Sequence, residues 1–96
     1  MEFIDAIKEV LIYEGRFSPE FSENLAQKIM SDSERLGLET PTFNLLWTTI
    51  NRETLYKKEF SQDLAEYILE LYHRGGYINK AEKEIDRILQ VLKPKK

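Results

Sequence analysis

The sequence contains no cysteine, a single histidine, four glycines and three prolines among its 96 residues. Without cysteine there are no disulfides, no cysteine-based zinc sites and no thiol chemistry. The lone His73 cannot build a metal site from several histidines, and no Ser-His-Asp triad is expected around it. No apolar run approaches the roughly 20 residues of a membrane-spanning helix. We therefore expect a protein with no catalytic site, cofactor or transmembrane segment.

The first residues also lack a secretion signal. Met1 is followed at once by Glu2 and soon by Asp5, where a signal peptide would have a basic and then an apolar segment. The absence of cysteine fits a reducing compartment. We expect a cytoplasmic protein.

The excess of negative over positive charge is small, because the net charge is only -3. Residues 1–48 carry four Lys or Arg and nine Asp or Glu, a net charge of -5, whereas residues 49–96 carry ten and eight, a net charge of +2. A chain with no strongly basic face is not expected to bind nucleic acid. The more basic second half suits either proximity to an anionic membrane surface or an acidic partner, or simply a solvated surface.

What the sequence does contain is helical periodicity, with apolar residues three and four positions apart and no strand-like alternation. The first predicted helix spans about residues 3–13 and stops at Gly15. The second begins at Ser18, a good N-cap, with Pro19 at the first helical position, and it stops at Gly37. The residues predicted to be buried in these two helices are Phe3, Ile7, Val10, Leu11, Phe21, Leu25, Ile29 and Leu36.

Two further helices are predicted from the same kinds of signal. Thr40 and Pro41 repeat the cap-then-proline pattern and open the third helix. Ser61 is predicted to cap the fourth helix, which the pair Gly75 and Gly76 closes. The residues predicted to be buried here are Phe43, Leu46, Trp47, Ile50, Leu55, Leu64, Ile68, Leu71 and Tyr72.

A last helix is predicted after a capping box formed by Asn79 and Glu82, and Pro94 marks its end. Its apolar stripe consists of Ala81, Ile85, Ile88, Leu89 and Leu92. Short amphipathic helices joined by tight loops predict an all-α fold, an antiparallel bundle of four to five short helices. With 96 residues the chain has room for one core, so residues 1–96 are expected to form a single domain.

A weak internal repeat occurs at a spacing of 43 residues. It relates Tyr13, Phe17, Ser18 and Glu20 to Tyr56, Phe60, Ser61 and Asp63. Phe-Ser at the start of a helix is common, so the pattern is as compatible with chance as with two related hairpins about a pseudo-twofold axis.

Two tyrosines are candidates for an exposed surface. Tyr67 falls off the buried stripe of its helix, and Tyr77 follows the glycine pair in a turn. Arg74 and Lys80 lie close to them in sequence. Exposed tyrosines beside cations are typical of protein-binding patches, so these four residues are candidate partner contacts.

From Gly37 onward the chain has a loop with Thr40-Pro41, a helix with Leu46 and Ile50, the basic pair Lys57-Lys58, and then Phe60-Ser61 opening a helix with Leu64, Ile68 and Leu71. Over about 40 residues this order resembles the bacteriocin immunity proteins of the enterocin A type. The well-capped final helix departs from the looser C-terminal tail of many members. In addition, residues 19–23 resemble a segment of the colicin D type immunity proteins.

The first resemblance implies a cytoplasmic helical bundle that protects a producer cell from its own toxin. Such proteins engage a toxin-bound sugar permease at the inner face of the membrane, mainly through their C-terminal half. The alternative is a small regulatory module that binds and masks a soluble protein. The oligomeric state is not indicated. Under the immunity hypothesis the contact candidates are Lys57, Lys58, Arg74, Tyr77, Lys93, Lys95 and Lys96.

Overall fold

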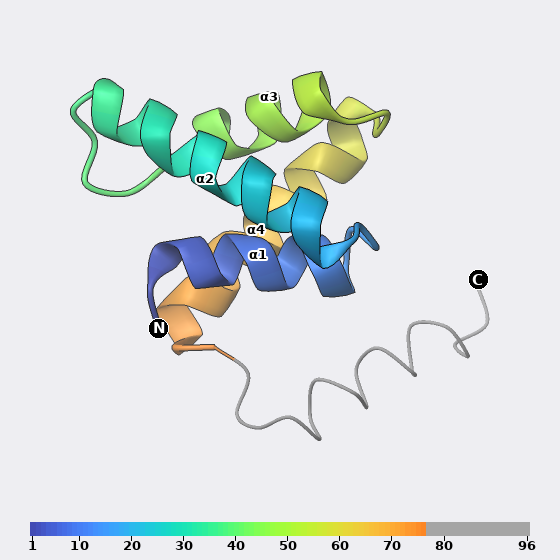
Figure 1. Ribbon diagram of the computed structural model, residues 1–96, viewed down its shortest axis with the longest axis horizontal. Helices are drawn as coiled ribbons and strands as arrows, with labels where there is room; N and C mark the ends of the chain where they lie inside the picture. Colours follow the sequence, from blue (N-terminus) through green and yellow to red (C-terminus); the bar gives the residue numbers. More distant parts are fainter. Residues whose placement is uncertain (77–96) are drawn as a thin grey trace.

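The computed structural model describes residues 1–76, which form four helices and no strand. The helices are α1 (Phe3–Tyr13), α2 (Pro19–Arg35), α3 (Phe43–Glu53) and α4 (Lys58–Arg74). Each helix reverses the direction of the one before it (Figure 1). The prediction of an all-α antiparallel bundle is therefore confirmed for the described part. The predicted last helix and five candidate contacts lie outside the described residues, namely Tyr77, Lys80, Lys93, Lys95 and Lys96.

The four helices are two copies of one helical hairpin. The helices have 11, 17, 11 and 17 residues in chain order. A shift of 39 residues superimposes Glu20-Phe21-Ser22 on Glu59-Phe60-Ser61, and it aligns Leu25, Ala26 and Ile29 with Leu64, Ala65 and Ile68. Each hairpin packs its two helices together, and α1 contacts α4 while α2 contacts α3. Exchanging the hairpins preserves these contacts, as a pseudo-twofold axis requires.

Burial follows the same 39-residue repeat. The side chains of Ile29 and Ile68 are completely buried at equivalent positions of α2 and α4. Ile7 and Leu46 are completely buried at equivalent positions of α1 and α3. All four belong to one apolar cluster, so the two hairpins share a core and neither is complete without the other.

The two hairpins therefore correspond at a spacing of 39 residues and not at the spacing of 43 residues noted in the sequence. That spacing pairs Ser18 with Ser61, and the structure gives these two serines different roles. Ser18 caps α2 by accepting a hydrogen bond from the Phe21 amide at 3.1 Å. Ser61 lies inside α4 and is completely buried, because α4 begins one turn earlier, with Lys57 at its N-cap and no side-chain cap. The true equivalent of Ser61 is the buried Ser22.

Other local predictions also need correction. The cap of α3 is Thr42, whose hydroxyl accepts a hydrogen bond from the Leu45 amide at 3.2 Å, so Pro41 precedes the cap. Leu36 is 63% exposed because it lies at the C-cap of α2, past the last buried turn. Leu55 is 103% exposed because α3 ends at Glu53. Phe21 is 37% exposed at the first turn of α2, where it packs on another ring.

Glycine ends three of the helices, as predicted, but for different reasons. At the end of α4, Gly75 has a φ of 86°, a left-handed conformation that favours glycine. Gly15 is required by close packing, because a Cβ atom there would lie 2.8 Å from the Leu11 carbonyl oxygen. The left-handed residue of that turn is Arg16, with a φ of 61°. Within the described residues no helix has the length and apolar character that crossing a membrane requires.

Candidate partner-binding surface

The turns of both hairpins lie side by side at one end of the molecule, here called the turn end (residues 14–18 and 54–57; Figure 1). The Tyr56 hydroxyl of the second turn donates a hydrogen bond to the Gly15 carbonyl of the first at 2.6 Å. These residues are 41 positions apart in the sequence. The hydrogen bond joins the two hairpins directly and holds their turns in a fixed relation.

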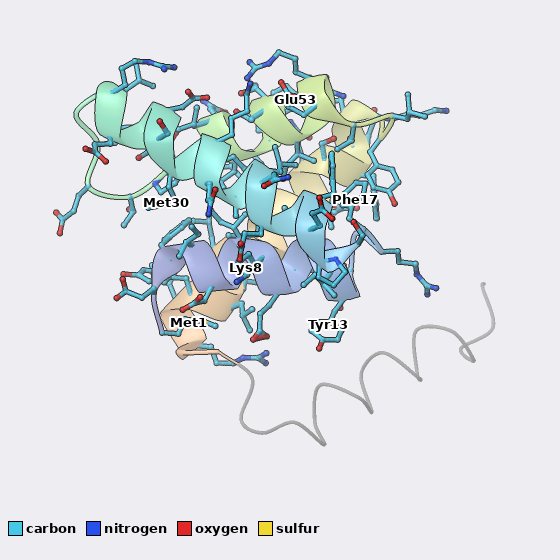
Figure 2. All side chains as sticks on the ribbon, viewed as in Figure 1. Met1, Lys8, Tyr13, Phe17, Met30 and Glu53 are labelled. Atoms are coloured by element: carbon cyan, nitrogen blue, oxygen red, sulfur yellow. The ribbon has the colours of Figure 1, made fainter. Side chains whose placement is uncertain are left out.

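Four aromatic rings line the turn end, here called the aromatic row. Phe17 and Phe21 have ring centroids 4.8 Å apart, Phe17 and Tyr56 are 5.2 Å apart, and Tyr56 and Phe60 are 4.5 Å apart. The 39-residue repeat relates Phe17 to Tyr56 and Phe21 to Phe60, so the row is symmetric about its centre. Figure 2 shows Phe17 at this end, next to the start of α2. Tilted rings at these distances pack favourably and stiffen the base of both turns.

The second turn is built from side-chain hydrogen bonds. The Asn51 side-chain amide donates to the Tyr56 carbonyl at 2.9 Å, and the Thr54 hydroxyl donates to the Ile50 carbonyl at 2.7 Å. The same hydroxyl accepts from the Tyr56 amide at 3.1 Å. Leu55 sits at the tip of this bonded turn with its side chain fully exposed. The turn therefore presents a leucine to solvent on a well-ordered support.

Each of the two turns also carries an exposed cation. Lys57 is exposed at the N-cap of α4, and Arg16 is exposed at the tip of the first turn. Lys58 is also exposed, and its ammonium group lies 5.6 Å from the centre of the Trp47 ring, within the range of a cation–π interaction. The turn end thus combines an exposed leucine, aromatic support and the exposed cations Arg16 and Lys57.

Tyr67 lies elsewhere on α4, in an acidic environment. Its side chain is 42% exposed, as its off-stripe position predicted. Partial burial, followed by the nearby carboxylates of Asp63, Glu14, Glu70 and Glu66, raises the pKa of its phenol above the ordinary value of 10.0. The described residues around Tyr67 are therefore mainly acidic.

Arg74 is in the last turn of α4. It is 16 residues from Lys58, a separation of roughly 24 Å along a helix. Of the candidates predicted from sequence, Lys57 lies at the turn end with Lys58 next to it in the first turn of α4, and Tyr67 and Arg74 lie farther along α4. The helical spacing from Ile50 predicts a buried Leu55, but α3 ends at Glu53 and this leucine is exposed instead.

The described residues offer little for metal chemistry. Among residues 1–76, no three His, Cys, Asp or Glu side chains gather as a metal site requires. Comparisons of the chain with protein families, with curated proteins and with solved structures returned no match.

Proposed function

We propose that this protein acts by binding another protein through its turn end and catalyses no reaction of its own. The observation that carries the proposal is Leu55, fully exposed at the tip of a turn fixed by Asn51 and Thr54. Burying a leucine side chain in an interface contributes about 1.5–3 kcal/mol. Because the turn is already ordered, little of that gain is lost to conformational entropy on binding.

The exposed cations Arg16 and Lys57 at the turn end favour an acidic partner. Both residues are exposed, and they lie on different hairpins. Charges at the rim of an interface mainly accelerate association and select against partners of the same sign. A partner with an apolar pocket bordered by carboxylates fits this surface.

The specific form we propose is bacteriocin immunity in the cytoplasm. The resemblance to the enterocin A type includes Lys57-Lys58 and Phe60-Ser61, and of these residues Lys57 belongs to the turn end and Phe60 to the aromatic row. Under this proposal the partner is the toxin-bound sugar permease at the inner face of the membrane. Masking of a soluble protein is the alternative form, and it uses the same surface.

The test is protection of a bacteriocin-sensitive Gram-positive strain that expresses the chain and is challenged with a panel of antilisterial peptides. We expect protection against one peptide and loss of that protection in Leu55→Asp. The matched control is Leu36→Asp, because Leu36 is also an exposed leucine after a helix but lies in the loop between α2 and α3. Both variants are checked for abundance and helical content.

Each outcome separates the parts of the proposal. No protection by the folded wild-type chain sinks the immunity form, and capture of a stoichiometric soluble partner by the wild type but not by Leu55→Asp then supports the masking form. Equal effects of Leu36→Asp and Leu55→Asp on binding or protection would show that the turn end is not the binding surface.

A further inference from the structure

A shared core and two polar contacts join the two hairpins. Between the hairpins, α1 packs on α4 and α2 packs on α3, and the pseudo-twofold axis makes these two contacts equivalent. The Tyr56 hydroxyl donates a hydrogen bond to the Gly15 carbonyl at 2.6 Å, and the Lys28 ammonium lies 3.4 Å from the Glu53 carboxylate. Each of these polar contacts crosses from the first hairpin to the second.

The polar contacts are specific for unlike hairpins. The 39-residue repeat makes Phe17 the equivalent of Tyr56, so two first hairpins packed together would lack the hydroxyl donor. The repeat also makes Tyr67 the equivalent of Lys28, so two second hairpins packed together would lack the ammonium group. The surface that each hairpin buries therefore fits the other kind of hairpin better than its own kind.

These contacts do not require that both hairpins belong to one chain. The covalent connection between the hairpins is the loop of residues 36–42 between α2 and α3, here called the hinge loop. It lies at the end of the molecule opposite to the turn end (Figure 1). Seven extended residues span up to roughly 24 Å. Opening of the hinge loop therefore leaves the second hairpin free to pack on the first hairpin of a second copy.

The closed form of the hinge loop depends on Gly37. This glycine has a φ of 76°, in the left-handed region, and its amide donates to the Glu34 carbonyl at 2.9 Å. The Leu38 amide then donates to the Ser33 carbonyl at 2.9 Å. A Cβ atom at Gly37 would have no atom within 4 Å. The backbone conformation of this one glycine, and not packing around it, therefore turns the chain back toward the first hairpin.

We propose that two copies of the chain exchange their second hairpins through the hinge loop and form a twofold dimer. In this dimer the first hairpin of each copy packs on the second hairpin of the other, so the core and both polar contacts are kept. Each turn end then combines Arg16 of one copy with Leu55 of the other, and the dimer presents two such ends. The proposal is independent of the immunity and masking forms, since it concerns the protein alone.

The absence of cysteine allows a direct test in the full-length chain, because an introduced cysteine is the only cross-linking site. The variants Lys28→Cys and Glu53→Cys are mixed, unfolded in urea and refolded together at about 1 mM, the order of the effective concentration that a short linker provides. A bis-maleimide then links neighbouring thiols. We expect a dimer in size-exclusion chromatography whose two chains are linked between positions 28 and 53. As the matched control, Lys28→Cys refolded alone should give several-fold less cross-linked dimer.

A second measurement tests the hinge loop. Gly37→Val places a β-branched residue in the left-handed region and so disfavours the closed loop, whereas an extended hinge accepts valine. The substitution should raise the dimerisation constant roughly tenfold or more, since each dimer contains two hinges. The matched control is Gly75→Val, because Gly75 has a φ of 86° and equally open surroundings but lies outside the hinge loop. It should leave the dimerisation constant unchanged in sedimentation velocity.

Three results overturn the proposal. The first is a wild-type chain that remains wholly monomeric after refolding at this concentration. The second is a dimer without the link between positions 28 and 53, which would mean that the copies associate without exchanging hairpins. The third is an equal increase in dimerisation from Gly37→Val and Gly75→Val. Circular dichroism reports that each variant is folded, and the cross-linking result decides the proposal even where a valine variant fails to fold.

Discussion

The turn of the first hairpin has a glycine, Gly15, where the turn of the second hairpin has a threonine, Thr54, at the equivalent position of the repeat. The first turn depends on backbone groups, with the Phe17 amide donating to the Leu11 carbonyl at 3.0 Å and no room for a Cβ atom at Gly15. The second turn depends on side chains, with the Thr54 hydroxyl bonded on both sides. The two turns thus differ in chemistry, although each connects a helix of 11 residues to a helix of 17 residues.

The difference shows where a duplicated hairpin is free to diverge. The core positions Leu25, Ile29, Leu64 and Ile68 keep their residue types because each is enclosed by the other hairpin. The turns only need to reverse the chain and accommodate the aromatic row. The exposed residues Arg16 and Leu55 are therefore free to differ, and binding specificity is expected in such positions.

The largest expected effect tests whether the two hairpins contribute equally to the core. Ile29→Ala and Ile68→Ala remove the same atoms from equivalent, completely buried positions. Each should lower the free energy of unfolding by about 2–5 kcal/mol, because a buried isoleucine leaves a cavity. Urea denaturation followed by circular dichroism measures both. A loss confined to one variant would show that the hairpins are energetically unequal.

The helices themselves could be predicted from the sequence, because the residues that end them are close to the helix ends in the chain. Gly15, Gly37 and Gly75 mark the ends of α1, α2 and α4 in the structure as they did in the pattern. The start of α4 could not, since Lys57 is a poor cap and Ser61 looks like a good one. The buried role of Ser61 depends on packing in the assembled bundle.

The repeat was present in the sequence as Glu-Phe-Ser-x-x-Leu-Ala-x-x-Ile, starting at Glu20 and again at Glu59. The caps predicted at Ser18 and Ser61 are 43 residues apart, so they do not follow this 39-residue spacing. The candidate surfaces were harder to predict. The joining of Gly15 to Tyr56 and the acidic surroundings of Tyr67 both involve residues far apart in the chain. No local pattern carries that information.

The next prediction separates the two turn chemistries. Gly15→Ala should destabilise the protein by about 1–3 kcal/mol, because the new methyl group collides with the Leu11 carbonyl oxygen. Thr54→Ala should cost about 1–2 kcal/mol through the loss of its two hydrogen bonds. Thr54→Ser is the control, since it keeps the hydroxyl and should recover most of the loss. Thermal or urea unfolding gives the values, and a neutral Gly15→Ala would refute the packing argument.

A smaller effect is expected from the unequal helix caps. Ser18→Ala removes the side-chain acceptor at the start of α2 and should lower the free energy of unfolding by about 1 kcal/mol. Lys57→Ala removes no cap hydrogen bond at the equivalent position and should change stability by less than about 0.5 kcal/mol. The same urea titration compares the two variants. Equal losses would mean that Lys57 stabilises α4 in another way.

The smallest effect concerns Tyr67. The 39-residue repeat makes Tyr67 the equivalent of Lys28, whose ammonium lies 3.4 Å from the Glu53 carboxylate. The raised phenol pKa means that the folded protein holds this proton more tightly than the unfolded chain, whose tyrosines titrate near pH 10. The contribution of the neutral phenol to stability is therefore fully present below that pH and is lost as the pH rises through the folded pKa. NMR of tyrosine ring carbons should show Tyr67 titrating above the ordinary value.

The control variant is Lys28→Tyr, which places a phenol at the equivalent position beside Glu53 and Arg52. Because Arg52 lies 3.3 Å from the Glu53 carboxylate, the new tyrosine should titrate at a lower pH than Tyr67. Raising the salt concentration to 1 M shortens the Debye length to roughly 3 Å, which should lower the pKa of Tyr67 by removing the carboxylate effect and leaving the effect of burial. A Tyr67 pKa at or below 10.0, or below that of the introduced tyrosine, would mean that the two contacts do not differ electrostatically as their sequences require.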